Sequence, residues 1–599
     1  MAKKKAASKK PQKLPTWDLS HLYSGITDHA ITRDMTQVAK ESTSFAKDYE
    51  KKIKTLSAPK FAEAIRRYEK LSDTMGKLGS YAQLLYAADM SDGKVTQFYQ
   101  NTSEALTLHS SKLVFFTLEI NSLSDDNLSK LIKGSKVVAH YKPWLNTIRS
   151  FKPYQLSDAL ERFIHENSVT MQSWTRLYDE SSARLEFKVK GKKLASAEVF
   201  DLLSSKDPKA RKDGAKEIAR VYAENAPLYT LITNTLAKAK HIEDETRKFK
   251  RSISSRNVAN QVEDEVVDAL IGTVKANYKN LSHRYYKWKA KQFGKKKLDY
   301  WDRNAPLPKS ADGNIPWPKA VSIVQDAYAA FSPTMADVGK HFFSGNWIDV
   351  PARKSKASGA FAHPVVPSAH PYLLLNYLGK TRDVMTLAHE LGHGVHQVLS
   401  GRQGALMCDT PLTLAETASV FGEMLTFQSL LGQEKDKKKR RAMIASKVED
   451  MLNTVVRQTA FCEFERMVHD ERKLGELSNK RIGEIWMQVQ SESLGPAIQL
   501  HPEYNVYWMY IPHFIHTPFY VYAYAFGDCL VNSLYGVYQK EKKAGKGVAF
   551  ADKYIDMLAA GGTLRHKELL KPFGLDASKP DFWQQGLDVI SKYIDELEA

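Results

Sequence analysis

Apolar residues recur with a period near 3.6 along most of this chain, and this pattern predicts a mainly α-helical protein. It is clearest over residues 26–135, in stretches such as "KFAEAIRRYEKLSDTMGKLGSYAQLLYAADM". It returns over residues 156–183, continues to about residue 293, and dominates again from about residue 381 to the end. The chain contains no internal repeat that would suggest a solenoid.

Several segments interrupt the helical pattern. A break is expected from Lys142 to Pro153, after which Ser157 can cap the next helix. The stretch "LEFKVKGKKL" alternates in polarity and turns at Gly191, which predicts a small β-hairpin. From "FGKKKLDYWDRNAP" to "NWIDVPARKSKASGAF" the chain is predicted to be rich in loops.

The run "HPYLLLNYLG", residues 370–379, is short and apolar and is followed by a glycine, so it predicts a β-strand. An exposed edge at this strand could pair with an extended peptide. A strand buried on both sides would have the same composition, and periodicity does not separate the two.

With 599 residues, the chain is too long for a single hydrophobic core. We predict a disordered basic tail over residues 1–14, a helical domain over residues 15–200 and a larger catalytic domain over residues 201–599. The tail contains six lysines in "MAKKKAASKKPQK", and no apolar segment of the kind found in signal peptides follows it.

The formal net charge is +19, from 87 basic and 68 acidic residues. The basic residues gather in lysine runs such as "KDKKKRR" at 435–441, without the interleaved aromatic residues of a single-strand binding surface. We therefore expect a solvated basic surface and no nucleic-acid partner. No apolar run is long enough to predict a membrane span, so no membrane partner is expected either.

Cysteine use suggests the compartment. The three cysteines, Cys408, Cys462 and Cys529, are far apart in the sequence, and an odd number argues against a disulfide framework. A reducing cytoplasm is the predicted location.

The stretch "LAHELGHGVHQ", residues 387–397, contains the strongest chemical signal. On a helix, His389 and His393 lie about 40° apart around the axis and about 6 Å apart along it, so both can bind one zinc ion. Glu390 lies beside them and can take a proton from a water molecule without binding the metal.

His396 falls on the same helical face, but it lies about 10.5 Å along the axis from His389. That distance excludes it as a ligand of the same ion and favours a supporting role. Metzincins place a third histidine ten residues after the first, where this chain has Leu399. The third ligand must therefore come from another element.

The segment "TPLTLAETASVFGEMLTF", residues 410–427, supplies that element, because Thr410–Pro411 is expected to begin a helix there. Glu416 and Glu423 share one face but lie about 10.5 Å apart, so only one can bind the metal. Small residues at Ala415 and Ala418 permit close helix packing, which favours Glu416 as the ligand and leaves Glu423 to orient a ligating histidine.

Three protein ligands leave one position of a zinc ion open for water, which is typical of a hydrolytic site. Hydrolysis also needs hydrogen-bond donors for the oxyanion that develops. The segment "YIPHFIHTPFYVYAYAFGD", residues 510–528, is rich in neutral donors. Its candidates are His513, His516, Tyr520, Tyr522 and Tyr524.

Together these stretches resemble the thimet-oligopeptidase-like zinc metallopeptidases, most closely their oligoendopeptidase F branch. The matching segments are "TLAHELGHGVHQ", "AETASVFGE", "SGAF", "HPYLLLNYLG", "IPHFIHTPFYVYAYAFG" and "LLKPFGLDASKPDFWQQGL". The resemblance implies an elongated, mostly helical zincin-like fold with a small β-sheet next to the zinc helix. It also implies a deep central channel that admits short peptides and excludes folded proteins.

The resemblance assigns one Zn²⁺ per chain to His389, His393 and Glu416, and the catalytic carboxylate to Glu390. His513 and Tyr524 resemble the pair that stabilises the substrate carbonyl. The thimet branch has a glycine–tyrosine pair where this chain has "HTPFY", so two further residues are alternative donors. These are His516 and Tyr520.

The leading functional hypothesis is a zinc endopeptidase acting on short peptides. The alternative is a zinc carboxypeptidase, which would need a cation for the terminal carboxylate, with Arg353 or Lys356 as candidates. A binding protein that captures peptides or nucleic acid without cleaving them is disfavoured, because Glu390 is present in the motif.

Overall fold

The computed structural model describes residues 14–307, 314–357 and 359–599, so of the predicted basic tail only Leu14 is described. Helices dominate these residues, which confirms the predicted fold class. No helix in the described ranges is both long enough and apolar enough to cross a membrane. The helices up to residue 183 are α1 (His29–Tyr49), α2 (Ala58–Ala88), α3 (Gly93–Ser111), α4 (Val114–Ser122), α5 (Asp125–Lys133), α6 (Lys136–His140), α7 (Lys142–Arg149) and α8 (Asp158–Ala183).

The remaining helices fall into two groups, separated by a small sheet. The first group is α9 (Ser196–Asp201), α10 (Pro208–Glu224), α11 (Ala226–Thr246), α12 (Ser254–Ala259), α13 (Asp264–Ala276), α14 (Arg284–Gln292), α15 (Trp317–Phe331) and α16 (Pro333–Ser344). The second group is α17 (Thr381–Ser400), α18 (Leu412–Gln433), α19 (Lys437–Thr454), α20 (Val456–Leu474), α21 (Asn479–Leu494), α22 (His513–His516), α23 (Tyr522–Lys543), α24 (Gly547–Ala559), α25 (His566–Leu570) and α26 (Pro580–Glu598).

Two local predictions are confirmed. The Ser157 hydroxyl accepts the backbone N–H of Leu160 at 3.4 Å and caps α8. The predicted hairpin consists of β1 (Phe187–Val189) and β2 (Lys192–Leu194), which pair antiparallel. Lys190 and Gly191 between them both have positive φ, which is the conformation of a tight hairpin turn.

Two predicted interruptions are wrong. Helix α7 occupies Lys142–Arg149, inside the expected break, and α15 and α16 lie in the zone expected to be rich in loops. Each of these helices carries a proline in its first two positions. Proline is tolerated there because the first N–H groups of a helix have no intrahelical partner, so these prolines begin helices and do not interrupt them.

The central strand of the sheet beside α17 is β6 (Tyr372–Tyr377). It pairs in parallel with β4 (Ile348–Pro351) and antiparallel with β5 (Phe361–His363), and its side chains are almost all buried. The structure therefore decides between the two interpretations of "HPYLLLNYLG" in favour of the buried strand, and β5 forms an edge. A second short pair, β3 (Leu298–Asp299) and β7 (Ile498–Gln499), lies elsewhere and is parallel.

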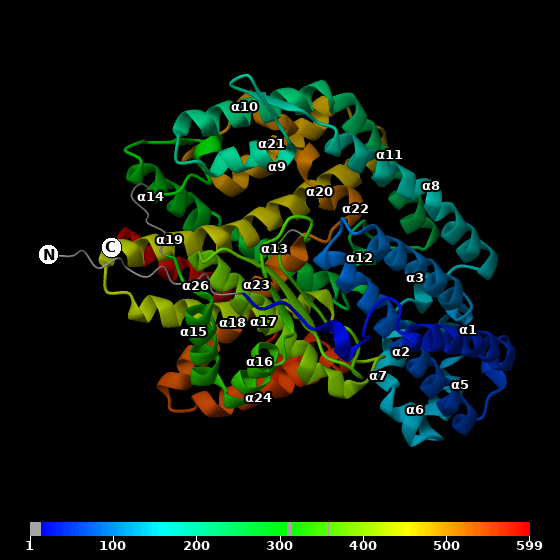
Figure 1. Cartoon of the computed structure of the whole chain (residues 1–599). Helices are drawn as coiled ribbons and strands as arrows, with labels where there is room; N and C mark the ends of the chain where they lie inside the picture. The colour runs from blue at the N-terminus through cyan, green and yellow to red at the C-terminus, as the bar shows by residue number, and fades with distance from the viewer. Residues whose placement is uncertain (1–13, 308–313, 358) are drawn as a thin grey trace.

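The helices up to α7 lie to one side of the molecule in Figure 1, coloured blue to cyan, while α17 and α18 lie nearer its middle. The N-terminal helices have their own apolar clusters, and these clusters include Val365, Val366, Tyr372 and Met407. Those four residues belong to the segments that precede and follow α17. The N-terminal helices thus support both ends of the helix that contains the histidine motif.

The largest core extends from Tyr178 to Leu597. The predicted domain boundaries, after residue 14 and after residue 200, stay predictions.

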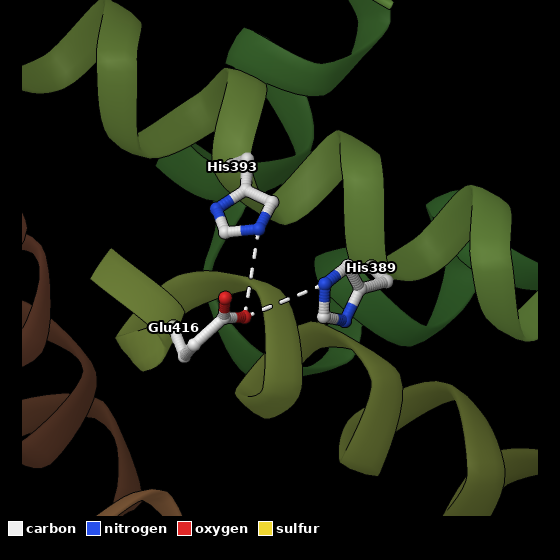
Figure 2. Close-up of side chains that lie close together, drawn as sticks. All are labelled: His389, His393 and Glu416. Carbon is white, nitrogen blue, oxygen red and sulfur yellow. Dashed lines mark ion pairs between the residues drawn. The ribbon is translucent and has the colours of Figure 1, made fainter. Parts of the chain in front are cut away.

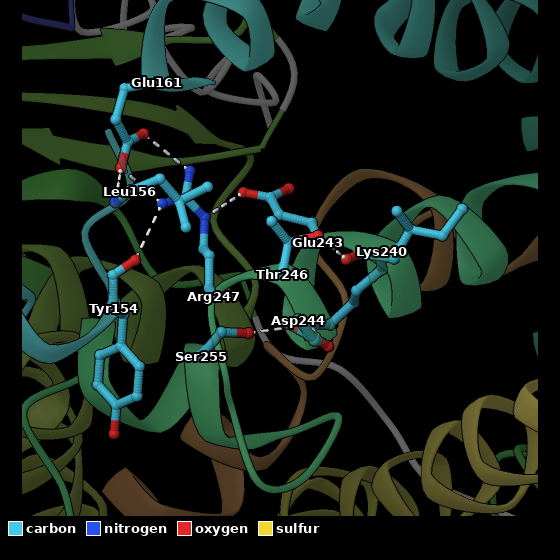
Figure 3. A network of polar contacts seen from close by, with 10 residues as sticks. Tyr154, Leu156, Glu161, Lys240, Glu243, Asp244, Thr246, Arg247 and Ser255 are labelled. Atoms are coloured by element: carbon cyan, nitrogen blue, oxygen red, sulfur yellow. Dashed lines mark hydrogen bonds and ion pairs between the residues drawn. The ribbon is translucent and has the colours of Figure 1, made fainter. Parts of the chain in front are cut away.

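A polar network fastens the start of α8 to the end of α11 (Figure 3). The Arg247 guanidinium donates to both oxygens of Glu161, at 2.8 and 3.0 Å, and to the backbone carbonyl of Tyr154 at 3.2 Å. This guanidinium holds the pKa of the Glu161 carboxyl below its usual value. A two-pronged arginine–carboxylate contact fixes orientation as well as distance, so the network sets the direction in which α8 leaves the body of the protein.

Candidate metal centre

Helix α17 buries one apolar side and turns its histidines towards α18. The Asp383 carboxylate accepts the N–H groups of Leu378 and Lys380 and holds the first turn in place. One turn separates His389 from His393, and their ring centroids lie 4.9 Å apart. The helix thus presents two imidazoles from consecutive turns on one face, as predicted.

Glu416 on α18 completes the cluster. Its Oε2 lies 3.4 Å from Nε2 of His389 and 3.5 Å from Nε2 of His393, and Figure 2 shows both rings pointing at this one oxygen. Ligands at zinc–nitrogen distances of about 2.0–2.1 Å on a tetrahedral ion are about 3.3–3.4 Å apart. The observed separations match the edge of such a tetrahedron, so the donor set fits a zinc-sized ion.

The electrostatics of this cluster favour a cation. Burial opposes a charge on His389, but the surrounding carboxylates, Glu423 and Glu416 among them, raise its pKa to about 9. Burial lowers the pKa of His393 to about 4. Burial also acts against ionised Glu416, yet the two imidazoles hold its pKa below the usual value. A divalent cation can take the place of the proton that the carboxylates attract.

Glu423 lies on the other side of His389, as the spacing on α18 predicts. Its Oε2 is 3.5 Å from Nδ1 of His389, and its Oε1 is 2.5 Å from the Lys447 ammonium. A carboxylate at Nδ1 favours the tautomer that leaves Nε2 free for a metal. Lys447 was not among the residues that sequence reasoning identified.

Glu390 lies next to the cluster and lines a cavity of about 330 Å³ together with residues of β6 and the segment leading into β5. Glu390 is only 7% exposed to solvent. Burial raises the pKa of its carboxyl to about 7, and a hydrogen bond with the Ala362 backbone acts in the opposite direction. A carboxyl that titrates near neutrality can both accept and return a proton.

His396 does not join the cluster; among the described residues the metal-ligand geometry is met by His389, His393 and Glu416. Its Nε2 lies 3.3 Å from the hydroxyl of Thr410. Thr410 does not cap α18 as predicted. The helix begins at Leu412, and its N-cap residue is Pro411, whose side chain makes no capping hydrogen bond. His396 supports the segment that leads into α18.

The predicted donors divide into two groups. His513, Tyr520 and Tyr524 lie together: Nε2 of His513 is 3.3 Å from the Tyr524 hydroxyl, and the rings of Tyr520 and Tyr524 are 5.3 Å apart. The charge on Glu416 contributes to raising the pKa of both tyrosines, after burial in each case. The two tyrosines therefore lie within electrostatic range of Glu416.

The other two candidates point elsewhere. His516 forms an ion pair with Asp179 of α8 at 2.8 Å. The Tyr522 hydroxyl accepts from Asn260 inside the core. The structure thus does not bring His516 or Tyr522 to the cluster.

The turn before Tyr520 is held by residues that sequence reasoning missed. Phe519 has a φ of +60°, a strained value for a side chain of that size. Its N–H donates to Oε1 of Glu465 at 2.7 Å, and Arg256 donates to the carbonyl of Pro518. The distant positions of Glu465 and Arg256 in the sequence gave no signal of this contact.

Helices α17 and α18 cross where Gly392 stands. A Cβ built at this position would lie 2.4 Å from the carbonyl oxygen of Ala418 and 2.6 Å from Cα of Ser419. A Cβ at Gly527 of α23 would likewise lie 2.8 Å from Cβ of Glu416. Two glycines thus allow α17 and α23 to approach α18 closely enough to surround Glu416.

Gly392→Ala is expected to force α17 and α18 apart, because the atoms it would meet are backbone and cannot rotate away. We expect a loss of about 1–3 kcal/mol in the free energy of unfolding and weaker zinc binding, measured by denaturant unfolding and chelator competition. Gly536→Ala on α23 is the matched control, since nothing lies within 4 Å of its Cβ. Unchanged zinc affinity in Gly392→Ala would contradict the role given to this crossing.

Comparison with known proteins covers most of the chain. A family model described as "Peptidase family M3" matches residues 201–589, and one described as "Oligopeptidase F" matches residues 119–187. The chain is 25% identical over 616 residues to Oligopeptidase PepF of Bacillus subtilis, covering 100% of this chain and 90% of that protein. It is 25% identical to an oligoendopeptidase F homolog of Borreliella burgdorferi, covering 97% of each.

Solved structures show the same fold. A protein of Chlamydophila abortus superposes with a TM-score of 0.85 at 22% identity, covering 97% of both chains. Oligoendopeptidase-F from Enterococcus faecium superposes with a TM-score of 0.72 at 20% identity, covering 95% of this chain and 98% of that one. The resemblance to the oligoendopeptidase F branch is thereby confirmed. Because the family match spans more than half of the chain, this protein belongs to peptidase family M3 and is a metalloendopeptidase.

Proposed function

We propose that this protein is a zinc-dependent endopeptidase that hydrolyses internal bonds of short oligopeptides, with one Zn²⁺ bound by His389, His393 and Glu416. The observation that carries the proposal is the spacing of the three donor atoms. Separations of 3.4 and 3.5 Å match a tetrahedral zinc site. Two imidazoles and a carboxylate leave the fourth position of such a site open.

Glu390 is the general base in this proposal. Zinc at this site would supply Lewis acidity towards a water molecule and the substrate carbonyl. Glu390 takes a proton from the attacking water and returns it to the leaving amine. Its burial supports this role, because a pKa near neutrality suits both transfers.

His513 and Tyr524 are proposed to donate hydrogen bonds to the carbonyl oxygen as negative charge develops on it, with Tyr520 beside them. The contact between His513 and Tyr524 and the effect of the Glu416 charge on Tyr524 support this assignment. His516 is left out of the proposed donor set, because Asp179 holds it.

Strand β5 is the proposed docking edge for an extended peptide. In the part of the chain that the structure describes, β5 pairs with β6 alone, and its Ala362 backbone contacts Glu390. Pairing along an edge recognises main chain, so side-chain specificity should be broad. Short peptides are thus the proposed substrates, and the free thiols of all three cysteines agree with the predicted cytoplasmic location.

Both cations that were suggested to bind the substrate carboxylate in a carboxypeptidase are engaged by another residue. Arg353 donates to both oxygens of Asp349 at 2.6 and 2.7 Å. Lys356 is buried and binds the same carboxylate at 3.0 Å. Neither side chain is free to hold the terminal carboxylate of a substrate.

Peptide products test the proposal. A mixed library of short peptides, each made with a free and with an amidated C-terminus, is digested and analysed by mass spectrometry. We expect internal cleavage of both forms at similar rates, and no cleavage after a chelator removes the metal. Cleavage limited to the last one or two residues of the free peptides would show a carboxypeptidase and overturn the proposal.

A further inference from the structure

Behind His389, a line of polar side chains leads away from the metal centre and ends at a buried lysine. Nδ1 of His389 faces one oxygen of Glu423, and the other oxygen of Glu423 contacts the Lys447 ammonium at 2.5 Å. These three residues come from α17, α18 and α19 in turn. The line connects a metal-binding residue to a helix that supplies no ligand itself.

Lys447 is buried in an acidic environment. Its side chain is 6% exposed, and Glu423 is the carboxylate with which it forms an ion pair in the described part of the chain. Two further carboxyl groups act on its charge from a distance, Asp528 on α23 and Asp450 on its own helix. The ring of Phe427 on α18 lies 5.9 Å from the ammonium and closes the apolar side.

Burying an ammonium costs free energy that its partners must offset, so the position of Lys447 is tightly constrained. The ammonium binds the oxygen of Glu423 that does not face His389. It thereby restricts rotation of the carboxylate and keeps the other oxygen directed at Nδ1. It also supplies a positive charge amid Glu416, Glu423 and Asp528, which would otherwise repel one another.

We propose that Lys447 is a positioning residue for the metal centre, acting through Glu423 to hold His389 with Nε2 directed at the ion. The inference rests on the proposed zinc site and adds a residue that touches neither metal nor substrate. Residues that orient metal ligands typically change metal affinity 10–100-fold when they are replaced.

Zinc affinity of the full-length protein, measured by competition with a chromophoric chelator, tests this inference without any peptide. Lys447→Met should weaken zinc binding about 10–100-fold and alter the visible spectrum of the cobalt-substituted protein. In a Glu423→Gln background, adding Lys447→Met should change the affinity by less than about twofold, because the carboxylate it acts through has gone. Wild-type affinity in Lys447→Met, or an equal loss in both backgrounds, would overturn the proposal.

Lys289→Met is the matched control. Lys289 is a fully buried lysine on α14 that pairs with Glu449 of the same helix as Lys447. Among the described residues, no hydrogen bond or ion pair links that pair to His389 or His393. The substitution should reduce stability without changing zinc affinity. If Lys447→Met does not fold, Lys447→Gln retains a hydrogen-bond donor for Glu423, and its zinc affinity should fall between those of wild type and Glu423→Gln. Wild-type affinity in that variant would reject the inference.

The two proposals fail in different ways. A wild-type protein that binds zinc but cleaves no peptide would contradict the proposed function. The comparison of zinc affinity between wild type and Lys447→Met would still test the role of Lys447. A wild-type protein that cleaves peptides, paired with normal zinc affinity in Lys447→Met, would contradict only the role of Lys447.

Discussion

Glu390→Gln is expected to lower kcat/KM by about 10²–10⁴-fold, the range typical of a missing general base. The amide has nearly the size of the carboxylate and can still accept a hydrogen bond from the Ala362 backbone, but it cannot take a proton from water. Because Glu390 is not among the three clustered ligands, zinc content should stay at one ion per chain. Metal analysis and steady-state kinetics on a peptide cleaved by the wild type measure both quantities.

The control for this substitution is Glu484→Gln, the same chemical change at an exposed position on α21. It should leave both zinc content and kcat/KM unchanged. A Glu390→Gln variant that cleaves as fast as the wild type would reject Glu390 as the base. A variant that has lost its zinc would show that Glu390 contributes to metal binding.

Glu416→Ala is expected to abolish zinc retention and, with it, peptide hydrolysis. The substitution removes the carboxylate that both imidazoles face, so only two neutral ligands would remain. The loss of affinity should exceed the 10–100-fold typical of residues that merely orient ligands. Zinc content after dialysis, measured by atomic emission, gives the result.

A pair of histidine variants on α17 serves as the comparison. His393→Asn removes a proposed ligand and should behave like Glu416→Ala. His396→Asn replaces a histidine on the same helix that contacts Thr410 and stands outside the cluster. It should retain zinc, although its burial predicts some loss of stability. Loss of zinc in His396→Asn but not in His393→Asn would refute the ligand assignment.

Sequence patterns gave correct predictions for features that depend on the geometry of a single helix or turn. The 3.6-residue period located most helices, and the turn at Gly191 located the hairpin. Helical geometry alone separated His389 and His393 from His396, because angle and rise per residue are the same in every α-helix. It also showed that Glu416 and Glu423 share one face but lie too far apart for both to bind the same ion.

Local sequence patterns gave wrong or undecided predictions where the same residue type occurs in more than one structural setting. Pro143 lies in the predicted break and Pro333 in the zone predicted to be rich in loops, yet both stand in the first turns of helices. The strand "HPYLLLNYLG" had the composition of a buried or an edge strand, and only its pairing with β4 and β5 decided. His516 was predicted as an alternative donor to His513, but it contacts Asp179, which belongs to a helix far away in the sequence.

The sequence by itself determined the metal-binding motif, the helical class and the face on which each ligand stands, because these depend on geometry within one element. Only the tertiary structure showed that α23 and α19 join these two helices and that a lysine lies behind Glu423. Gly392 and Gly527 bring three helices together around Glu416, and Lys447 reaches Glu423 from a fourth. Such contacts join positions with no fixed spacing in the chain, so no periodicity could have indicated them.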